Sequence, residues 1–257
     1  NETASLRVIG LTIETRPDYL DPRDYDKKLN GILDSDERVY RNLKFFRKLG
    51  VTRVQIGVQH TDDDILKLVN RECTNELNKK AIKFLKQNGF KVDIHLMLDL
   101  PGSTPNLDKL MLKEVYSNPD YESDQGKLYP TEVTDFSEIK KWYDSGKYKP
   151  YAETNLEDLV EVIIEAKKMM KPWIRINRII RDIPPISIEG GVNCPDLRKQ
   201  IEEKMHKQGL YCKCIRCREV KQKKVMDHDI ELKIRHYEGS NGDEYFISYE
   251  TYDEKTL

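Results

Sequence analysis

Short apolar runs alternate with longer amphipathic stretches along the first two thirds of the chain. The amphipathic stretches predict helices over residues 37–50, 75–89 and 155–170, the last of them beginning at Asn155 as an N-cap. Runs rich in Val, Ile, Leu and Tyr predict strands at residues 7–15, 53–58, 91–100, 126–130 and 173–180. Such alternation indicates βα units around a parallel sheet. We therefore predict an α/β fold, a (βα) barrel that is partial or lacks its first part, because fewer than eight units are present.

The pattern changes after the Pro184-Pro185 pair. Residues 194–209 are predicted to form one helix, a cysteine cluster follows, and residues 229–251 alternate as two strands joined by a Ser-Asn-Gly-Asp turn. A lone hairpin is marginally stable in water, so this one is expected to begin a further, truncated domain. We divide the chain into a barrel (1–185), a linker (186–226) and a hairpin region (227–257). The acid-rich residues 20–37 lack apolar periodicity and are interpreted as a surface loop or insertion.

Composition narrows the class of protein. Hydrophobic residues make up 38% and charged residues 35% of the 257 positions, which is polar yet sufficient for a folded core. No stretch approaches the roughly 18 apolar residues of a membrane span, so we expect a cytoplasmic protein without a membrane partner. The chain does not begin with Met and its strand pattern starts at once, so it is expected to have been cut from a longer protein.

The formal net charge of −1 conceals a basic region. Residues 165–225 contain 16 Lys or Arg and 7 Asp or Glu, about +9, against about −10 for the rest of the chain. Such a region binds polyanions such as nucleic acid, although a solvated helix face gives the same count. Within it, Arg175, Arg178 and Arg181 surround a strand beside Trp173. Arginines next to an aromatic ring suit RNA phosphates and unstacked bases, and salt bridges at a strand end are the alternative.

Cys212, Cys214 and Cys217 form a C-x-C-x2-C cluster in a chain of five cysteines. Three thiolates this close together provide three of the four tetrahedral ligands that structural Zn²⁺ requires. An odd, clustered set does not fit a secreted disulfide framework. An iron–sulfur cluster, a redox pair and plain buried cysteines are the alternatives. The candidate fourth zinc ligands are Cys194, His206 and His228.

Polar residues and glycines gather at the predicted strand ends. In a parallel barrel the C-terminal strand ends meet at one face, where active sites form. A small-molecule cofactor pocket is therefore expected there, although a structural role is the alternative for any single residue. His95 is alone on its strand and is interpreted as a satisfied core residue. The residues at these ends are Glu14, Arg16, Gly57, Gln59, Asp99, Gly102, Tyr129 and Pro130.

Seven motifs in a fixed order make the chain resemble a known family. They are GLTIETRPDY, IGVQ, DLPG, KLYPT, RDIP, LR at 197–198 and CKCIRCREV. Together they resemble the catalytic subunit of Elongator, a radical S-adenosylmethionine and acetyltransferase protein that modifies the wobble uridine of tRNA. The resemblance runs from about residue 7 to residue 250.

The resemblance implies a partial barrel of radical S-adenosylmethionine type with a [4Fe–4S] cluster, joined by a zinc-containing linker to a GNAT-type acetyltransferase domain. The reaction it implies places a carboxymethyl group on C5 of the uridine, with acetyl-CoA as a substrate. The partners it implies are tRNA, bound at the anticodon region, and Elongator-type subunits or a second copy. By resemblance, Lys127 and Tyr129 line the reaction chamber, and Arg175, Arg178 and Arg181 face tRNA. The residues implied for S-adenosylmethionine are Glu14, Arg16, Gly57, Gln59, Asn70, Arg71 and Asp99.

The chain departs from this family in four places. The cluster-binding cysteines of the family lie upstream of ETRPDY, whereas the first cysteine here is Cys73. The acetyltransferase domain is truncated after one hairpin, residues 20–37 form an insertion, and Gln55 and His60 stand where Glu and Ser are expected. This polypeptide is therefore expected to be inactive alone. Two alternatives stay open: a radical S-adenosylmethionine enzyme acting on a small molecule such as a porphyrin precursor, and a non-catalytic RNA-binding or scaffold protein.

Overall fold

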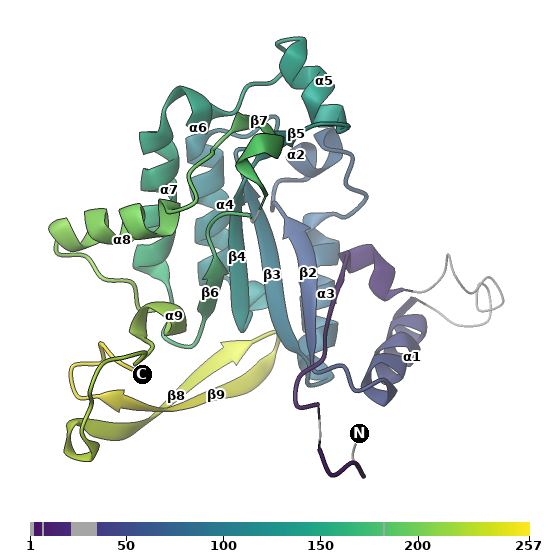
Figure 1. Ribbon diagram of the computed structural model, residues 1–257. Coiled ribbons are helices and arrows are strands. Elements are labelled where there is room, and N and C mark those ends of the chain that lie inside the picture. Colours follow the sequence, from purple (N-terminus) through teal and green to yellow (C-terminus); the bar gives the residue numbers. More distant parts are fainter. Residues whose placement is uncertain (1–2, 7, 22–34, 182) are drawn as a thin grey trace.

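A five-stranded sheet forms the centre of the protein (Figure 1). The computed structural model describes residues 3–6, 8–21, 35–181 and 183–257, so most of the predicted acidic insertion lies outside the described residues. The strand order is β1-β2-β3-β4-β6, and every neighbouring pair is parallel. This confirms the α/β fold and all five predicted strands, with a shorter first strand than predicted. The strands are β1 (Thr12–Thr15), β2 (Arg53–Gln59), β3 (Lys91–Leu98), β4 (Gln125–Pro130) and β6 (Arg175–Arg178).

Helices cover one face of the sheet and leave the other face open (Figure 1). Alternate strand side chains point to the two faces, so one set is buried beneath the helices and the other lines the open side. The three helices predicted before residue 185 are confirmed, and Asn155 accepts a hydrogen bond from the Glu157 N–H, as an N-cap does. None of the described helices is long and apolar enough to cross a membrane. The longer helices here are α1 (Ser35–Lys48), α3 (Asn75–Gln87), α4 (Pro105–Ser117), which was not predicted, and α7 (Leu156–Met169).

Short elements complete the C-terminal edge of the sheet. β5 (Glu132–Thr134) follows β4 and pairs in antiparallel fashion with β7 (Ile188–Gly191), so the chain after β6 returns to this edge. Neither strand was predicted, because each has only three or four residues and its partner lies far away in the sequence. The other short helices of the barrel region are η1 (Pro17–Leu20), α2 (Asp63–Leu68), η2 (Pro119–Tyr121), α5 (Glu138–Asp144), α6 (Tyr151–Thr154) and η3 (Pro185–Ser187).

The C-terminal hairpin packs against the opposite, N-terminal edge of the sheet (Figure 1). Its turn has left-handed φ angles of 52° at Ser240 and 62° at Asn241, as a tight hairpin turn requires. The Tyr237 ring stacks on Trp173, just before β6, with 4.2 Å between ring centroids, and Lys86 pairs with a hairpin glutamate. The hairpin therefore draws stability from the barrel. The elements after the barrel are α8 (Leu197–Lys207), α9 (Ile215–Arg218), η4 (Asp227–Asp229), β8 (Ile230–Gly239) and β9 (Gly242–Thr251).

Candidate active site

The C-terminal strand ends meet at one edge of the sheet, where the backbone adopts strained conformations. Gln59, Asn70 and Asp99 have φ angles of 67°, 57° and 61°. Non-glycine residues rarely adopt left-handed φ, and they keep it only where surrounding contacts enforce it. Such positions concentrate at binding sites, so this edge has the backbone geometry of a functional site.

A cavity of about 310 Å³, which we call the cofactor cavity, lies at this edge. Glu14, Gln59 and Arg71 come from β1, β2 and the segment after α2, and all three were predicted to contact S-adenosylmethionine. The structure therefore brings together three predicted residues that are far apart in the sequence. The full lining is Glu14, Gln59, Val69, Arg71, His95, Met97, Leu100, Tyr129 and Arg181.

Gly57 forms the floor beneath two of these side chains. Arg71 Nη2 donates a hydrogen bond to the Gly57 carbonyl at 2.7 Å, and the buried Nε of Arg71 has no partner among the described residues. A Cβ at position 57 would lie 2.8 Å from Gln59 Nε2 and 2.9 Å from Arg71 Nη2. An unpaired buried donor beside a glycine cradle fits a polar ligand such as S-adenosylmethionine.

Gly57→Ala is expected to weaken S-adenosylmethionine binding by about tenfold without unfolding the protein. The added methyl group meets only the ends of two flexible side chains, so it displaces the ligand contacts rather than the backbone. Saturation-transfer NMR titrations with S-adenosylmethionine measure the change. Gly10→Ala is the control, because a Cβ there meets nothing closer than 3.9 Å. An equal loss of affinity in Gly57→Ala and Gly10→Ala would contradict the assignment of this cavity to S-adenosylmethionine.

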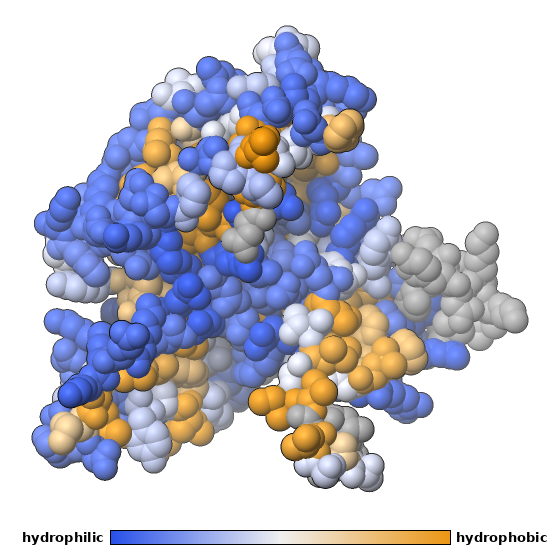
Figure 2. Space-filling model, in the orientation of Figure 1, coloured by the Kyte–Doolittle hydropathy of each residue, from blue (hydrophilic) through white to orange (hydrophobic). Residues whose placement is uncertain are grey.

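A second cavity of about 580 Å³, which we call the polar chamber, adjoins the first. Lys127 and Tyr129, the two predicted catalytic residues, both line it, and Lys127 Nζ donates to Gln55 Oε1 at 2.9 Å. The open face of the sheet is hydrophilic in this region (Figure 2). The full lining is Glu14, Gln55, His95, Lys127, Tyr129, Asn177, Arg178, Arg181, Ile183 and Arg216.

His95 lies in the wall between the two cavities. Glu14, His95, Tyr129 and Arg181 line both of them, and of these His95 is the buried one. Its Nδ1 lies 3.4 Å from Glu14 Oε1, and its buried Nε2 has no hydrogen-bond partner among the described residues. Burial and the charges of Lys127 and Arg181 lower the His95 pKa to about 4, so the ring is neutral at pH 7. The interpretation of His95 as a satisfied core residue is therefore wrong.

A register argument could have found His95. It pairs directly with Lys127 across β3 and β4, so both side chains point to the same face. Asp93, two residues earlier, points the same way and accepts a hydrogen bond from Asn177 Nδ2 at 3.0 Å. Burial raises the Asp93 pKa to about 6, although nearby Lys127 opposes the shift. The polar residues on this face of β3 thus extend from His95 in the chamber to Asp93, nearer the start of the strand.

Besides Gly57, three other residues predicted for S-adenosylmethionine lie outside the lining of the cofactor cavity. Both Asp99 carboxylate oxygens accept backbone N–H groups, from Tyr151 at 2.8 Å and Ala152 at 2.9 Å, so this buried side chain anchors the start of α6. Arg16 pairs with Asp18, at 2.6 Å, and with Glu72. Asn70 is exposed. Asp99 is therefore occupied by a structural contact, and its predicted contact with S-adenosylmethionine stays a prediction.

The two unexpected residues in the IGVQ region have separate roles. Gln55 lines the polar chamber through its bond to Lys127. His60 is buried away from both cavities, where Nδ1 accepts the Asp62 backbone N–H at 3.0 Å and Nε2 lies 3.5 Å from Asp108. Of the two departures, only Gln55 therefore reaches the site.

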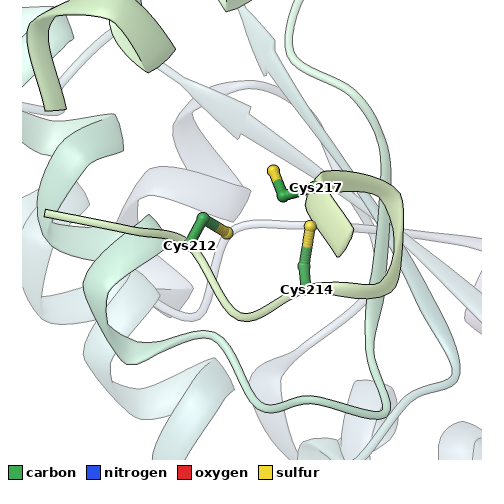
Figure 3. A group of neighbouring side chains, drawn as sticks. All are labelled: Cys212, Cys214 and Cys217. Carbon is green, nitrogen blue, oxygen red and sulfur yellow. The ribbon is translucent and has the colours of Figure 1, made fainter. Parts of the chain in front are cut away.

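The three clustered cysteines converge on one point in the linker (Figure 3). The Sγ atoms of Cys212, Cys214 and Cys217 all lie within 4.8 Å of one another, and no other such group of metal-binding side chains occurs among the described residues. Hydrogen bonds from the neighbouring thiols lower the Cys214 pKa, which favours a thiolate there. Three convergent sulfur donors fit the tetrahedral preference of zinc.

The surroundings of this trio were only partly predicted. Lys167 is fully buried, and its Nζ lies 3.3 Å from both Cys217 Sγ and Glu202 Oε1. Burial alone would lower the Lys167 pKa, but the three cysteines and Glu202 outweigh it and raise the value. The three candidate fourth ligands have different surroundings. His206 lines a cavity together with Cys212 and Cys217. Cys194 contacts Asp196 and Gln200 instead, and His228 is exposed.

The cysteine trio and the cofactor cavity lie at opposite edges of the sheet. The Ile215 N–H, next to Cys214, bonds to the carbonyl of Ile174, just before β6 begins. Two single cysteines lie near the C-terminal edge: the Cys73 thiol donates to Asp18 Oδ1 at 2.9 Å, and Cys194 lines a neighbouring cavity with Arg181. Burial raises the Cys73 pKa to about 11. The cysteines of this chain therefore do not fit a [4Fe–4S] cluster at the cofactor cavity.

The three arginines predicted to face tRNA divide into two groups. Arg178 and Arg181 line the polar chamber, and the Arg181 guanidinium lies 5.9 Å from the centre of the Tyr129 ring. Arg175, at the start of β6, forms an ion pair with Glu219 of the linker and donates to Asn177 Oδ1 at 3.0 Å. Arg175 is thus committed to the contact between barrel and linker.

Two family models match consecutive parts of the chain. The Radical SAM superfamily model matches residues 3–111, and the Radical_SAM C-terminal domain model matches residues 123–207. The chain belongs to the radical SAM superfamily. Membership of this superfamily implies S-adenosylmethionine and a [4Fe–4S] cluster as cofactors.

Within the radical SAM superfamily, the chain is similar to the catalytic subunit of Elongator, as predicted. It is 42% identical over 256 residues to the tRNA uridine(34) acetyltransferase of Methanocaldococcus jannaschii, covering 97% of this chain and 43% of that protein. It is 33% identical over 261 residues to Elongator complex protein 3 of Homo sapiens, covering 100% and 44%. The solved Elp3 of Methanocaldococcus infernus with N-terminus deletion (1-46) superposes with a TM-score of 0.84 at 40% identity, covering 100% and 57%. The chain spans less than half the length of these curated relatives.

Proposed function

We propose that this chain forms the radical SAM part of an enzyme that modifies C5 of the wobble uridine in tRNA. The observation that carries the proposal is the pair of adjoining cavities, one for a cofactor and one polar, separated by a wall of four side chains. Because the two cavities share four lining residues, ligands bound in them lie next to each other in a fixed orientation, as hydrogen transfer between them requires. The names of the relatives, tRNA uridine(34) acetyltransferase and Elongator complex protein 3, support tRNA as the substrate.

S-adenosylmethionine supplies a carbon radical in this superfamily, and the protein supplies binding and orientation. Glu14, Gln59 and Arg71 hold the cofactor, and Gly57 leaves room for the Gln59 and Arg71 side chains. Asp99 holds the backbone at the start of α6, and Arg16 pairs with Asp18 and Glu72. Neither of them lines the cavity, and nor does Asn70. The iron–sulfur ligands are not among the cysteines of this chain, so we assign no step to a cluster.

In the polar chamber, Lys127 and Tyr129 orient the reacting groups of acetyl-CoA and the uridine. The Lys127 ammonium, fixed by Gln55, is placed to hold a carbonyl oxygen or a phosphate. Burial raises the Tyr129 pKa, so its hydroxyl keeps its proton and serves as a hydrogen-bond donor. Carboxymethylation at C5 with acetyl-CoA as a substrate is the reaction in this proposal, and the name of the relatives, tRNA uridine(34) acetyltransferase, supports an acetyl donor.

The linker trio Cys212, Cys214 and Cys217 holds a structural Zn²⁺ in this proposal, with a fourth ligand still to be assigned. Of the three candidates, His206 is favoured, because it lines the same cavity as two of the cysteines. The site lies away from the cofactor cavity, so its role is to fix the linker rather than to take part in the reaction. Assembly with Elongator-type subunits or with a second copy stays a prediction.

Binding of tRNA is expected to weaken strongly with salt, with log Kd changing by roughly 0.7 to 0.9 per log unit of salt for each phosphate contact. Arg178→Ala and Arg181→Ala are expected to weaken binding by about tenfold each, because both side chains line the polar chamber. Arg175→Ala is the matched control, since its guanidinium is held by Glu219. Fluorescence anisotropy with labelled tRNA at several salt concentrations measures these effects.

The outcomes of this titration separate the candidate functions. Salt-insensitive or absent tRNA binding would contradict the proposal. A radical SAM enzyme acting on a porphyrin precursor has no use for the basic region at residues 165–225, so it predicts no effect of the arginine variants on any RNA. A non-catalytic scaffold predicts tRNA binding without S-adenosylmethionine binding, and the Gly57 titration above tests that difference.

A further inference from the structure

A buried carboxyl group without any hydrogen-bond partner lies close to the polar chamber. Glu132, the first residue of β5, is 6% exposed, and neither of its carboxylate oxygens has a partner among the described residues. Most buried polar atoms in proteins are paired, because an unpaired one costs free energy. An unpaired carboxyl group in a folded protein therefore calls for a ligand that supplies the missing donors.

Glu132 lines a cavity of about 340 Å³ whose other walls are largely apolar. Small-molecule sites have this composition, a mostly apolar lining of a few hundred cubic ångströms with a few polar groups that set orientation. The polar side chains besides Glu132 are those of Arg181 and Asn193, and Cys194 also lines the cavity. The apolar walls consist of Ile180, Ile183, Pro184, Pro185, Ile188 and Pro195.

This cavity adjoins the polar chamber, in which the proposed function places the RNA. Arg181 lines it together with both the cofactor cavity and the polar chamber, and Ile183 lines it together with the chamber. A polynucleotide that places one base in the chamber can therefore place a neighbouring nucleotide in the adjoining Glu132 cavity. Flat apolar walls and an arginine suit an unstacked base, and the base edge then meets the carboxyl group.

We propose that the Glu132 cavity binds an unpaired guanine of the RNA, next to the nucleotide in the polar chamber. Guanine alone among the four RNA bases presents two adjacent N–H donors, N1–H and N2–H, on its Watson–Crick edge. These donors match the two acceptor oxygens of one carboxylate. Uracil offers a single N–H between two carbonyl oxygens, which a carboxylate repels. The inference rests on the proposed function for its biological setting, but the pocket itself is testable without tRNA.

The charge state of Glu132 sets the conditions of the test. Burial raises the Glu132 pKa to about 7, although nearby Arg181 opposes the shift. Above that pH the side chain is an acceptor at both oxygens, so the measurement is made at pH 8. The full 257-residue chain is titrated with guanosine 5′-monophosphate and with uridine 5′-monophosphate by isothermal calorimetry. The two probes carry the same phosphate, so their difference reports the base.

Guanosine monophosphate is expected to bind about tenfold or more tightly than uridine monophosphate, as a bidentate base contact provides. Glu132→Gln and Glu132→Leu are expected to bring the ratio to within about twofold. Both variants are expected to fold, because each removes an unpaired buried carboxyl group. Glu138→Gln on α5 is the control, since that side chain is 66% exposed and pairs only with Lys141 among the described residues.

Equal affinity of the wild-type protein for the two nucleotides overturns the proposal, and so does a guanine preference that survives in both Glu132 variants. The tRNA titration separates this result from the proposed function. Guanine selectivity that depends on Glu132 in a protein that fails to bind tRNA sustains the pocket and contradicts the tRNA function. If tRNA binding depends on Arg178 but the protein does not prefer guanosine monophosphate, the tRNA function is supported and the guanine pocket is contradicted.

Discussion

Removal of zinc is expected to lower the melting temperature of the protein by many degrees and to release the linker from the barrel. Cys214 is fully buried and belongs to the main hydrophobic core, together with Ile201 and Met205 of α8. Without a metal, three thiols and the ammonium group of Lys167 would share one buried site, with little to offset the cost of desolvation. Structural zinc contributes on the order of 10 kcal/mol to folding in small metal sites.

Metal analysis of the purified protein by mass spectrometry is expected to give about one zinc per chain. Cys214→Ser is expected to lose the metal and to unfold at a lower temperature, as followed by circular dichroism. Cys73→Ser is the control for metal content, because Cys73 is not a candidate zinc ligand and its thiol donates to Asp18. A His206→Ala variant that keeps full zinc occupancy would exclude His206 as the fourth ligand. Zinc-free protein with unchanged stability would contradict the assignment as a whole.

The sheet could be predicted from the sequence because apolar residues recur along each central strand, and in β2, β4 and β6 buried positions largely alternate with partly exposed ones. Ile56, Ile94 and Ile176 are each fully buried, and each lies in a predicted strand. The first strand was predicted too long, since Val8 and Ile9 are apolar but 62% and 94% exposed. A residue's apolar character does not reveal whether another element is present to cover it.

Site residues could be predicted where their place at a strand end brings them to the site. They could not be predicted where their role depends on a contact with a residue far away in the sequence. Glu14, Gln59 and Tyr129 lie at strand ends, which a parallel sheet brings to one edge. Asp99 also lies at a strand end, but the backbone of α6, about fifty residues later, takes both of its oxygens. Glu132 was missed because its burial depends on β7 and the segment after β6, which no local pattern links to it.

Glu250→Ala is expected to destabilise the protein by about 3–5 kcal/mol, the usual cost of removing one partner of a buried ion pair. Glu250 in β9 is fully buried and accepts hydrogen bonds from Arg218 at 2.7 Å and from Arg235 at 2.6 and 2.8 Å. Arg218 also donates to the carbonyls of Pro172 at 2.7 Å and Lys213 at 2.7 Å. One carboxylate thus joins the barrel, the linker and the hairpin. Without it the buried Arg218 guanidinium loses its carboxylate partner, and the partly exposed Arg235 keeps only Glu254.

The pH dependence of stability provides a second measurement on the same carboxylate. Burial alone would raise the Glu250 pKa, but hydrogen bonds from Arg235, Arg218 and Ser248 outweigh it and hold the pKa below its ordinary value of 4.5. A depressed pKa contributes stability that is present at neutral pH and is lost as the pH falls below that ordinary value. Urea unfolding at pH 7 and pH 3.5 is therefore expected to show a smaller acid-dependent loss in Glu250→Gln than in the wild type. Asp243→Asn, at the exposed hairpin end, is the control and is expected to change neither value by more than about 0.5 kcal/mol. An unchanged acid-dependent loss in Glu250→Gln would mean that the network of Arg218, Arg235 and Glu250 does not hold the three parts of the chain together.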